Sequence, residues 1–306
     1  MKSGILLIDK PEGITSYDVI RKLKKIFKTG KIGHAGTLDP FATGLLITAI
    51  GKATRILEYI SSENKTYEFE MILGKTTDSF DITGKIMEEK DWSYVNEETL
   101  YKTINEFKGE ILQVPPVFSA KKMNGERLYE KARRGEIINI PPVKVKIYEL
   151  SIEKIDFPLV KLKANVSKGT YIRSLVHDIG RKLGCGAVAK TLRRISVGKF
   201  DVSKAINLED ISYDTKLLTI DEVVDFPKIY VKNDFVNSVF NGQPPKAKNI
   251  TQTETFKKGE LVKILSENSE FIGIGIAKRN SSFIEKMKFL HPGEGVVKIK
   301  KIFKEF

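Results

Sequence analysis

Residues that bind metals or form disulfides are scarce in this sequence of 306 residues. A single cysteine, Cys185, excludes an internal disulfide. It lies between two glycines, where we interpret it as a small filler rather than a nucleophile. The three histidines, His34, His177 and His291, are spread too widely for the ligand spacing of a zinc site. We therefore expect neither a structural nor a catalytic metal.

Long apolar runs are missing as well. None approaches the roughly 18–20 residues that a membrane-spanning helix needs, and the N-terminus carries no cationic, apolar leader. The sequence also lacks the phosphate-binding motif G-x-x-x-x-G-K-[ST] and the serine motif G-x-S-x-G. These absences favour a cytoplasmic protein, and they leave carboxylate chemistry as the main catalytic candidate.

Positive charge, by contrast, is present in excess. Lysine and arginine number 52 against 39 acidic residues, which gives a net charge of +13 and a sequence pI near 9.4. An excess of this size favours a polyanionic partner. A lysine-rich surface without a specific partner would have the same composition, so charge alone does not separate the two interpretations.

Hydrophobic periodicity predicts strands alternating with helices. Alternation of apolar and polar residues indicates strands, and apolar residues at helical spacing indicate amphipathic helices. The apolar run at 4–10 predicts a short buried strand, and the strand pattern occurs at 65–73, 144–150 and 159–166. The helical spacing occurs at 16–27, 97–107 and 172–183. Thr15 or Ser16 is the expected N-cap of the first helix and Thr170 that of the third. Together with antiparallel signals, this order predicts an α+β fold.

A change of pattern near 226–232 predicts a domain boundary. We assign residues 1–228 to one domain, and the short strands and glycines of 229–306 to a small β-barrel-like module. Prolines bracket a basic segment at about 117–146, which we interpret as a protruding arm with a short helix over 125–135. Residues 121–150 hold eight lysines or arginines against four glutamates, a composition suited to gripping a polyanion.

The stretch GHAGTLDPFATGLL, residues 33–46, carries the strongest candidate for catalysis. Its glycines and its proline make it a poor helix and a poor strand. Its apolar residues nevertheless predict that the loop packs against the rest of the protein and is not a mobile loop in solvent. Asp39 is its one acid, and a carboxylate can act as nucleophile or base when it is held ionised. A buried anion needs a cation, for which Arg173 is a candidate. The alternative is that Asp39 is an ordinary Asp-Pro turn residue.

Two tyrosines could serve an enzyme that acts on a base of folded RNA. Such an enzyme takes the base out of its stack and holds it against an aromatic or apolar side chain. Tyr67 and Tyr171 lie at or near the edges of predicted elements and could do this. Either tyrosine could equally belong to the hydrophobic core.

Taken together, six segments resemble the pseudouridine synthases of the TruB family, and the resemblance covers nearly the whole chain. The C-terminal module resembles a PUA domain, a small RNA-binding barrel. Ala35 and Phe118 stand where many relatives have threonine and tyrosine, and neither position supplies essential chemistry. The segments are LLIDKPEGITSYDVI (6–20), GHAGTLDPFATGLL (33–46), KTYEFEMILGKTTDSFDITG (65–84), VPPVFSAKKMNGERLYEKARRG (114–135), KGTYIRSLVHDIG (168–180) and LRRISVGKF (192–200).

The resemblance implies a role for individual residues. Asp39 matches the catalytic aspartate, Arg173 the arginine that pairs with it, and Tyr67 the tyrosine that stacks on the flipped base. The remaining matches are contacts to the target nucleotide or its surroundings. They are His34, Tyr171, Leu192 and Lys10, the last being structural or phosphate-facing. Segment 114–135 matches an RNA-gripping insertion called the thumb.

The implied fold is α+β, with a mixed, largely antiparallel sheet flanked by helices, plus the PUA domain. The implied reaction is isomerisation of uridine 55 in the T loop of tRNA to pseudouridine, without a cofactor, a metal or a protein partner, by a monomer. Asp39 could attack C1′, add to C6, or remove a proton from the sugar, and Tyr67 or Asp39 could take the C5 proton. A synthase acting on another RNA, and an RNA-binding or tRNA-folding protein without catalysis, are the alternatives.

Overall fold

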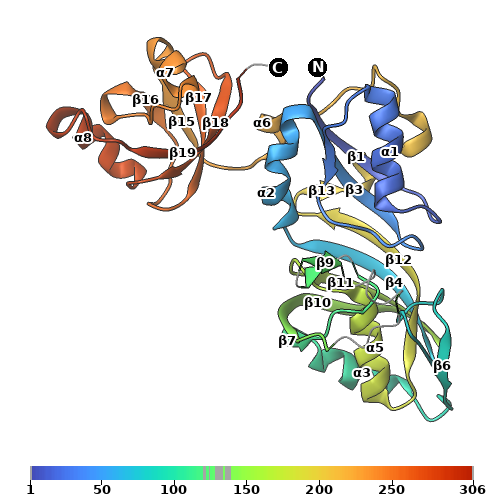
Figure 1. Ribbon diagram of the computed structural model, residues 1–306. Helices are drawn as coiled ribbons and strands as arrows, with labels where there is room; N and C mark the ends of the chain where they lie inside the picture. Colours follow the sequence, from blue (N-terminus) through green and yellow to red (C-terminus); the bar gives the residue numbers. More distant parts are fainter. Residues whose placement is uncertain (1, 120–121, 124, 128–133, 135–138, 305–306) are drawn as a thin grey trace.

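The computed structural model describes residues 2–119, 122–123, 125–127, 134 and 139–304, which form two lobes (Figure 1). The large lobe contains helices α1 (Ser16–Phe27), α2 (Leu57–Ser61), α3 (Glu97–Glu106), α5 (Ile172–Leu183) and α6 (Ile220–Val223). Its main strands are β1 (Gly4–Lys10), β2 (Ile32–His34), β3 (Thr43–Ile50), β4 (Lys65–Leu73), β7 (Gly109–Gln113), β10 (Val143–Asp156), β11 (Leu159–Val166), β12 (Ala187–Val197), β13 (Phe200–Asp201) and β14 (Ile206–Asn207). Two small hairpins pair β5 (Lys75–Thr77) with β6 (Ile86–Glu89) and β8 (Lys122–Met123) with β9 (Glu126–Arg127).

The main strands of the large lobe form one ten-stranded mixed sheet. Its order is β14-β1-β3-β12-β4-β11-β10-β7, with β2 paired to β3 and β13 to β12. The pairs β1–β14 and β12–β3 are parallel, and the other pairs are antiparallel. The expected α+β class and the largely antiparallel sheet are confirmed.

The C-terminal lobe has a sheet of its own. Its elements are β15 (Lys228–Val231), α7 (Val236–Phe240), β16 (Ile250–Thr253), β17 (Leu261–Ser266), β18 (Phe271–Ala277), α8 (Ile284–Leu290) and β19 (Val297–Ile302). The five strands run in the order β16-β15-β17-β18-β19. Phe303 and Ile274 share a buried cluster with residues of the large lobe, and Arg55 donates to the Ile302 carbonyl at 2.6 Å, so the lobes are packed together.

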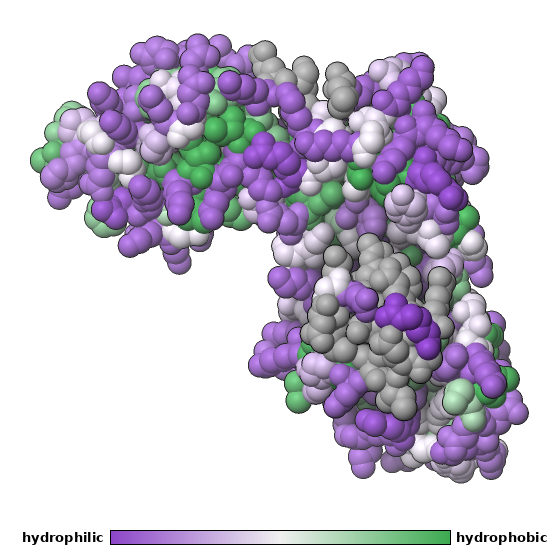
Figure 2. Space-filling model, viewed as in Figure 1, coloured by the Kyte–Doolittle hydropathy of each residue, from purple (hydrophilic) through white to green (hydrophobic). Residues whose placement is uncertain are grey.

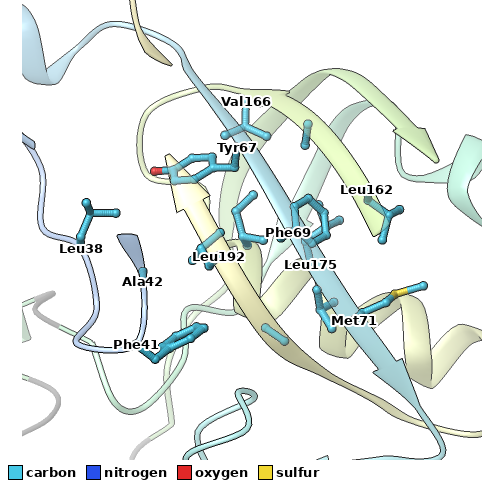
Figure 3. Close-up of a cluster of buried hydrophobic side chains, with 14 of the residues drawn as sticks. Leu38, Phe41, Ala42, Tyr67, Phe69, Met71, Leu162, Val166, Leu175 and Leu192 are labelled. Atoms are coloured by element: carbon cyan, nitrogen blue, oxygen red, sulfur yellow. The ribbon is translucent and has the colours of Figure 1, made fainter. Parts of the chain in front are cut away.

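Local sequence explains the elements that carry the site. Along β4, the side chains of Lys65, Tyr67, Phe69, Met71 and Leu73 are all buried, as the alternation predicts. Figure 3 shows Tyr67, Phe69 and Met71 on one side of this strand, in a buried cluster with Leu192 of β12 and Leu175 of α5. A core on this face therefore anchors three elements that carry predicted site residues.

Three expectations about local structure need correction. The motif 33–46 is a loop only at its centre, since its first residues belong to β2 and its last residues to β3. These two strands form backbone hydrogen bonds with each other in the sheet, which local sequence does not reveal. The N-cap of α5 is Tyr171 rather than Thr170, because the Thr170 hydroxyl instead donates to the Ser167 carbonyl at 2.9 Å. Within the arm, Glu126–Arg127 is a strand, and most of the helix expected at 125–135 lies outside the described residues.

The first helix follows its sequence signals. Thr15 accepts a hydrogen bond from the Asp18 backbone N–H at 3.0 Å, and the Asp18 carboxylate accepts from the Thr15 N–H at 2.9 Å. This capping box fixes the start of α1 beside the motif. Hydrophilic residues dominate the surface of both lobes in the view of Figure 2. No helix in the described part of the chain has the length and apolar character needed to cross a membrane.

Candidate active site

The loop that carries Asp39 is held in place by its buried apolar residues and by hydrogen bonds to α1. Leu38 and Phe41 are buried, at 3% and 8% exposure. Ser16, the first residue of α1, accepts a hydrogen bond from the Leu38 N–H at 2.8 Å and donates to the Leu38 carbonyl at 3.1 Å. The apolar residues of the loop therefore have a role. Leu38 is held by its buried side chain and by its backbone hydrogen bonds, and it fixes the position of Asp39, the next residue.

Two buried cations hold the rest of the loop. Lys10 is fully buried, and its ammonium donates to the carbonyls of Pro11, Ile14 and Pro40 at 2.7, 2.8 and 3.4 Å. Burial lowers the pKa of Lys10 to about 8. Lys10 does not line the cavity described below, so its placement favours the structural rather than the phosphate-facing interpretation.

Arg194 is the second cation, and sequence patterns predicted no role for it. Its side chain, 1% exposed, donates to the carbonyls of Leu45, Gly36 and Thr37 at 2.7, 3.0 and 3.4 Å. It thus ties both ends of the loop to β12. Periodicity could not identify it, because an arginine in a strand is usually expected to face water.

Gly44 makes the close approach between the loop and β12 possible. Its φ is +99°, and a Cβ there would lie 2.3 Å from the Arg194 carbonyl oxygen. We expect Gly44→Ala to lower the free energy of unfolding by more than about 2 kcal/mol, because backbone strain and a backbone clash act together. Gly13→Ala is the matched control, since Gly13 has φ +84° but open space around its Cβ. Equal losses for the two variants in denaturant melts would contradict this account.

Arg173 joins two carboxylates that are far apart in the sequence. Its NH2 donates to Asp39 Oδ1 at 3.1 Å, and its Nε lies 2.9 Å from Asp39 Oδ2 as an ion pair, which makes a two-point contact. NH1 donates to Asp81 Oδ2 at 3.1 Å and to the Ser79 carbonyl at 2.9 Å, and NH2 also donates to the Phe118 carbonyl at 2.8 Å. Both terminal nitrogens use their two N–H groups and Nε pairs with Asp39, so the guanidinium has one orientation and presents one edge to Asp39.

Asp81 is the residue that sequence reasoning missed at this site. It is 3% exposed, and its Oδ1 accepts from the Thr83 N–H at 3.0 Å and from the hydroxyls of Thr83 and Ser79 at 2.6 and 2.9 Å. The only local sign was an Asp-x-Thr turn pattern in a polar segment. A turn of this kind does not reveal that its acid also binds an arginine on a distant helix.

The environment of Asp39 acts on its pKa in opposing directions. Burial raises the pKa above the usual range of an aspartate, Arg173 opposes this, and the Asp81 carboxylate adds to it. The Asp39 side chain is 31% exposed, and it lines a cavity. Arg173 therefore orients the Asp39 carboxylate, while burial and the Asp81 carboxylate disfavour its charged form.

A pH profile should report this environment. If the reaction needs ionised Asp39, the rate falls as pH drops through its pKa, and a raised pKa moves that fall upward. We expect kcat/KM to decline on the acid side with an apparent pKa above about 3.9, the ordinary value for aspartate. An acid limb at or below that value, measured on RNA that stays folded over the range, would contradict the assignment.

A cavity of about 640 Å³ opens beside Asp39 and brings most of the predicted residues together. Tyr67 comes from β4, Leu192 from β12, and Tyr171 and Arg173 from the start of α5. Figure 3 shows Tyr67 directing its hydroxyl toward the side on which Leu38 lies. A flat ligand could therefore contact aromatic and apolar walls while Asp39 faces its edge.

Further features of the cavity suit an anionic ligand. Lys65, Lys144 and Lys168 line it, together with Arg194. Lys65 is buried, its ammonium donates to the carbonyls of Ser61 and Glu63 at 3.0 and 2.6 Å, and burial lowers its pKa to about 8. The surplus of cations over Asp39 favours a ligand that brings its own negative charge.

Not every predicted contact reaches this cavity. His34 lies in β2, ahead of the loop, and is outside the residues that line the cavity. Tyr171 is fixed by its backbone, since its N–H donates to Gln113 Oε1 at 2.8 Å and its carbonyl accepts from Gln113 Nε2 at 3.0 Å. Burial raises the pKa of Tyr171. Among the residues that the structure describes, no group of three or more potential metal ligands occurs.

Comparison with known families accounts for nearly the whole chain. Residues 24–172 match the N-terminal domain of the TruB family of pseudouridylate synthases, and residues 173–225 match the C-terminal domain of tRNA pseudouridylate synthase B. Residues 227–303 match the PUA domain. The three matches follow one another along the sequence, and the first two contain the cavity residues described above.

Individual relatives agree with this. The chain is 42% identical to tRNA pseudouridine synthase B of Thermosipho melanesiensis and 41% identical to that of Thermotoga maritima, with 99% of each chain covered. Among solved structures, it is similar to a chain of an H/ACA RNP bound to a substrate RNA containing 2'-deoxyuridine. That similarity has a TM-score of 0.74 and 27% identity, over 99% of this chain and 85% of the other. A chain of the archaeal box H/ACA sRNP Nop10-Cbf5 complex gives a TM-score of 0.73, with 27% identity over 98% and 86%.

Proposed function

Since the chain belongs to the TruB family and is a pseudouridine synthase, an isomerase, we propose that it converts uridine 55 in the T loop of tRNA to pseudouridine. Full-length relatives named tRNA pseudouridine synthase B support tRNA as the substrate class. The observation that carries the chemistry is the Asp39–Arg173 pair at the edge of a cavity with aromatic and apolar walls. In this proposal the protein acts as a cytoplasmic monomer that holds the T arm without a protein partner.

The proposed division of labour follows the predicted domains. Residues 1–228 perform catalysis, the thumb at about 117–146 grips the RNA, and residues 229–306 bind RNA as a PUA domain. Parts of the thumb, residues 120–121, 124, 128–133 and 135–138, lie outside the described residues. The described base of the thumb is tied to the site, since Arg173 donates to the Phe118 carbonyl at 2.8 Å and Ser174 to the Val114 carbonyl at 2.8 Å.

The chemistry requires that the target base leave its stack. The uracil N1–C1′ bond breaks, the ring turns, C5 bonds to C1′, the C5 proton leaves, and N1 gains a proton. No atom is gained from a co-reactant and no electron is transferred. Asp39 reacts with the sugar or with the ring, Arg173 keeps its carboxylate aimed, and Tyr67 stacks on the base, with Tyr67 or Asp39 taking the proton from C5. Tyr171 and Leu192 confine the nucleotide, and His34 contacts the opened loop.

Release of tritium from uracil C5 tests this proposal. A T-arm stem-loop labelled at C5 of the target uridine should release its tritium to water when wild-type protein is added without any cofactor. Binding without release would favour an RNA-folding role. Release only from other RNAs would favour a synthase with a different target. The similarity to chains of H/ACA complexes is the reason for testing this alternative.

Salt should weaken RNA binding steeply if the cavity rim contacts phosphates. Each phosphate contact adds about −0.7 to −0.9 to the slope of log K against log salt. We expect Lys168→Ala to reduce the magnitude of this slope by about 1, because Lys168 lines the cavity mouth. Lys154→Ala is the control, an exposed lysine of β10 that does not line the cavity. An unchanged slope for the Lys168 variant, measured by fluorescence anisotropy, would contradict the proposed rim contact.

A further inference from the structure

The segment that contains the thumb leaves the sheet and returns to it at one pair of residues. Gln113 is the last residue of β7, Val143 is the first residue of β10, and the two are partners in the antiparallel pairing of these strands. Val143 also lines the cavity beside Asp39. Gln113 therefore lies at the base of the thumb, where the chain leaves the sheet at the wall of the site.

The Gln113 side chain is fully buried and binds the backbone of the residue that precedes α5. Its Oε1 accepts from the Tyr171 N–H at 2.8 Å, and its Nε2 donates to the Tyr171 carbonyl at 3.0 Å. A primary amide places an acceptor and a donor side by side, so it can bind the N–H and the C=O of one residue together. Two such bonds fix the orientation of that residue, which a single bond would leave free to rotate.

The start of α5 lacks the usual local support. Tyr171 is the N-cap of this helix, and in the described part of the chain its side chain makes no capping hydrogen bond, as serine, threonine, aspartate or asparagine would. The Tyr171 carbonyl accepts a hydrogen bond from the Leu175 N–H in the first turn at 3.1 Å, and Gln113 binds the same carbonyl. The position of the helix start is therefore set from the base of the thumb.

Two further contacts join the same two segments. The Ser174 hydroxyl donates to the Val114 carbonyl at 2.8 Å, and Arg173 NH2 donates to the Phe118 carbonyl at 2.8 Å. Ser174 and Arg173 are both buried, at 2% and 3% exposure. These contacts hold the first turn of α5, whereas Gln113 holds the residue before it. Arg173 is thus carried by a turn whose entry depends on Gln113.

We propose that Gln113 is a positioning residue for the reaction. It fixes Tyr171 at the cavity wall and, through it, the start of the helix that carries Arg173. Gln113 is not among the described residues that line the cavity, so it acts through these two residues and not on the substrate. This deepens the proposed function and rests on it. Because a misplacement of about 1 Å costs about 100-fold in rate, a small shift of the helix start would slow the reaction without unfolding the protein.

Gln113→Glu tests this with a change of almost no size. A protonated glutamate accepts from the Tyr171 N–H and donates its O–H to the Tyr171 carbonyl, as glutamine does. An ionised glutamate has no donor and places a negative oxygen against that carbonyl. The ordinary pKa of glutamate is about 4.3, and burial raises it. The rate of the variant, divided by the rate of wild type at the same pH, should therefore fall as pH rises.

Other charged groups at this junction do not produce the same change. Arg173 stays charged at every pH from 5.5 to 8.5, and burial raises the pKa of the Tyr171 phenol, so it stays neutral. Asp39 titrates in wild type as well, and the ratio of rates removes its effect. Asn105→Asp is the matched control, an amide-to-acid change at an exposed position on α3 of the same lobe.

Single-turnover tritium release from the T-arm stem-loop is the measurement. We expect the ratio for Gln113→Glu to fall about 10-fold between pH 5.5 and pH 8.5, and Gln113→Leu to be about 30-fold slow at every pH. The ratio for Asn105→Asp should stay near 1. In an Asp39→Asn background, RNA binding by both Gln113 variants should stay within about threefold, and denaturant melts should show them folded at each pH.

A ratio for Gln113→Glu that stays constant over this range would overturn the proposal, as would a wild-type rate for Gln113→Leu. Loss of RNA binding in parallel with loss of release would also overturn it, because Gln113 would then serve only the fold. If Gln113→Leu does not fold, the pH dependence of Gln113→Glu decides alone. Normal release by wild type with unaffected variants removes this role and leaves the proposed reaction intact, whereas no release by wild type removes the proposed reaction itself.

Discussion

Replacing Asp39 with asparagine should lower the rate of tritium release by a factor of about 10⁴ or more. Asparagine keeps the size of the side chain and one oxygen that can accept from Arg173, but it has no negative charge and cannot act as nucleophile or base. Since Asp39 reaches the cavity at its edge, binding of RNA should change less than about threefold. Single-turnover release and anisotropy, measured on the same protein, separate the two effects.

The matched control is Asp214→Asn, which removes one negative charge from an exposed loop of the same lobe. It should leave both release and binding unchanged. A slow but substantial rate with the Asp39 variant, within about 10-fold of wild type, would show that another group performs the chemistry. Loss of binding in parallel with loss of release would show that Asp39 serves the fold of the loop rather than the reaction.

Replacing Arg173 with methionine should damage stability as well as activity. The change leaves Asp81, whose side chain is 4% exposed, and Asp39 without their shared cation. Removing one member of a buried ionic group costs about 3–5 kcal/mol of unfolding free energy. The pKa of Asp39 should then rise further, because burial already raises it and Arg173 is the largest opposing influence. Tritium release should fall to the level of the Asp39 variant.

A second substitution separates the two effects of losing Arg173. Adding Asp81→Asn to Arg173→Met removes one of the stranded charges and should restore part of the lost stability, but no activity. Arg181→Met is the matched control on the same helix, and its 78% exposed side chain should cost less than about 0.5 kcal/mol. Wild-type stability of Arg173→Met in denaturant melts would contradict the role of the buried ionic group.

Local pattern was enough to predict the elements that build the site. The alternation over 65–73 fixes which side of β4 is buried, and with it the position of Tyr67. The charge argument also anticipated the contact between Asp39 and Arg173, because a buried carboxylate requires a cation. These inferences succeeded because the first depends on the pattern of a single strand, and the second depends only on the need of a buried carboxylate for a nearby cation.

The rest of the site depends on contacts that no local pattern records. Asp81 meets Arg173 across 92 positions of sequence, and Arg194 reaches the carbonyl of Leu45 across 149. Both look like ordinary surface residues until the sheet brings β12, α5 and the loop together. The N-cap of α5 was misplaced by one residue for a similar reason, since the Thr170 hydroxyl had a competing acceptor in Ser167.

Mapping the product in a complete tRNA tests the central claim most directly. An unmodified tRNA transcript is incubated with the wild-type protein in buffer without cofactor, and pseudouridines are located by chemical labelling followed by primer extension. The proposed function predicts one new pseudouridine per molecule, at position 55, and none when Asp39→Asn replaces wild type. A pseudouridine at a different position, or an unmodified tRNA after complete binding, would contradict it.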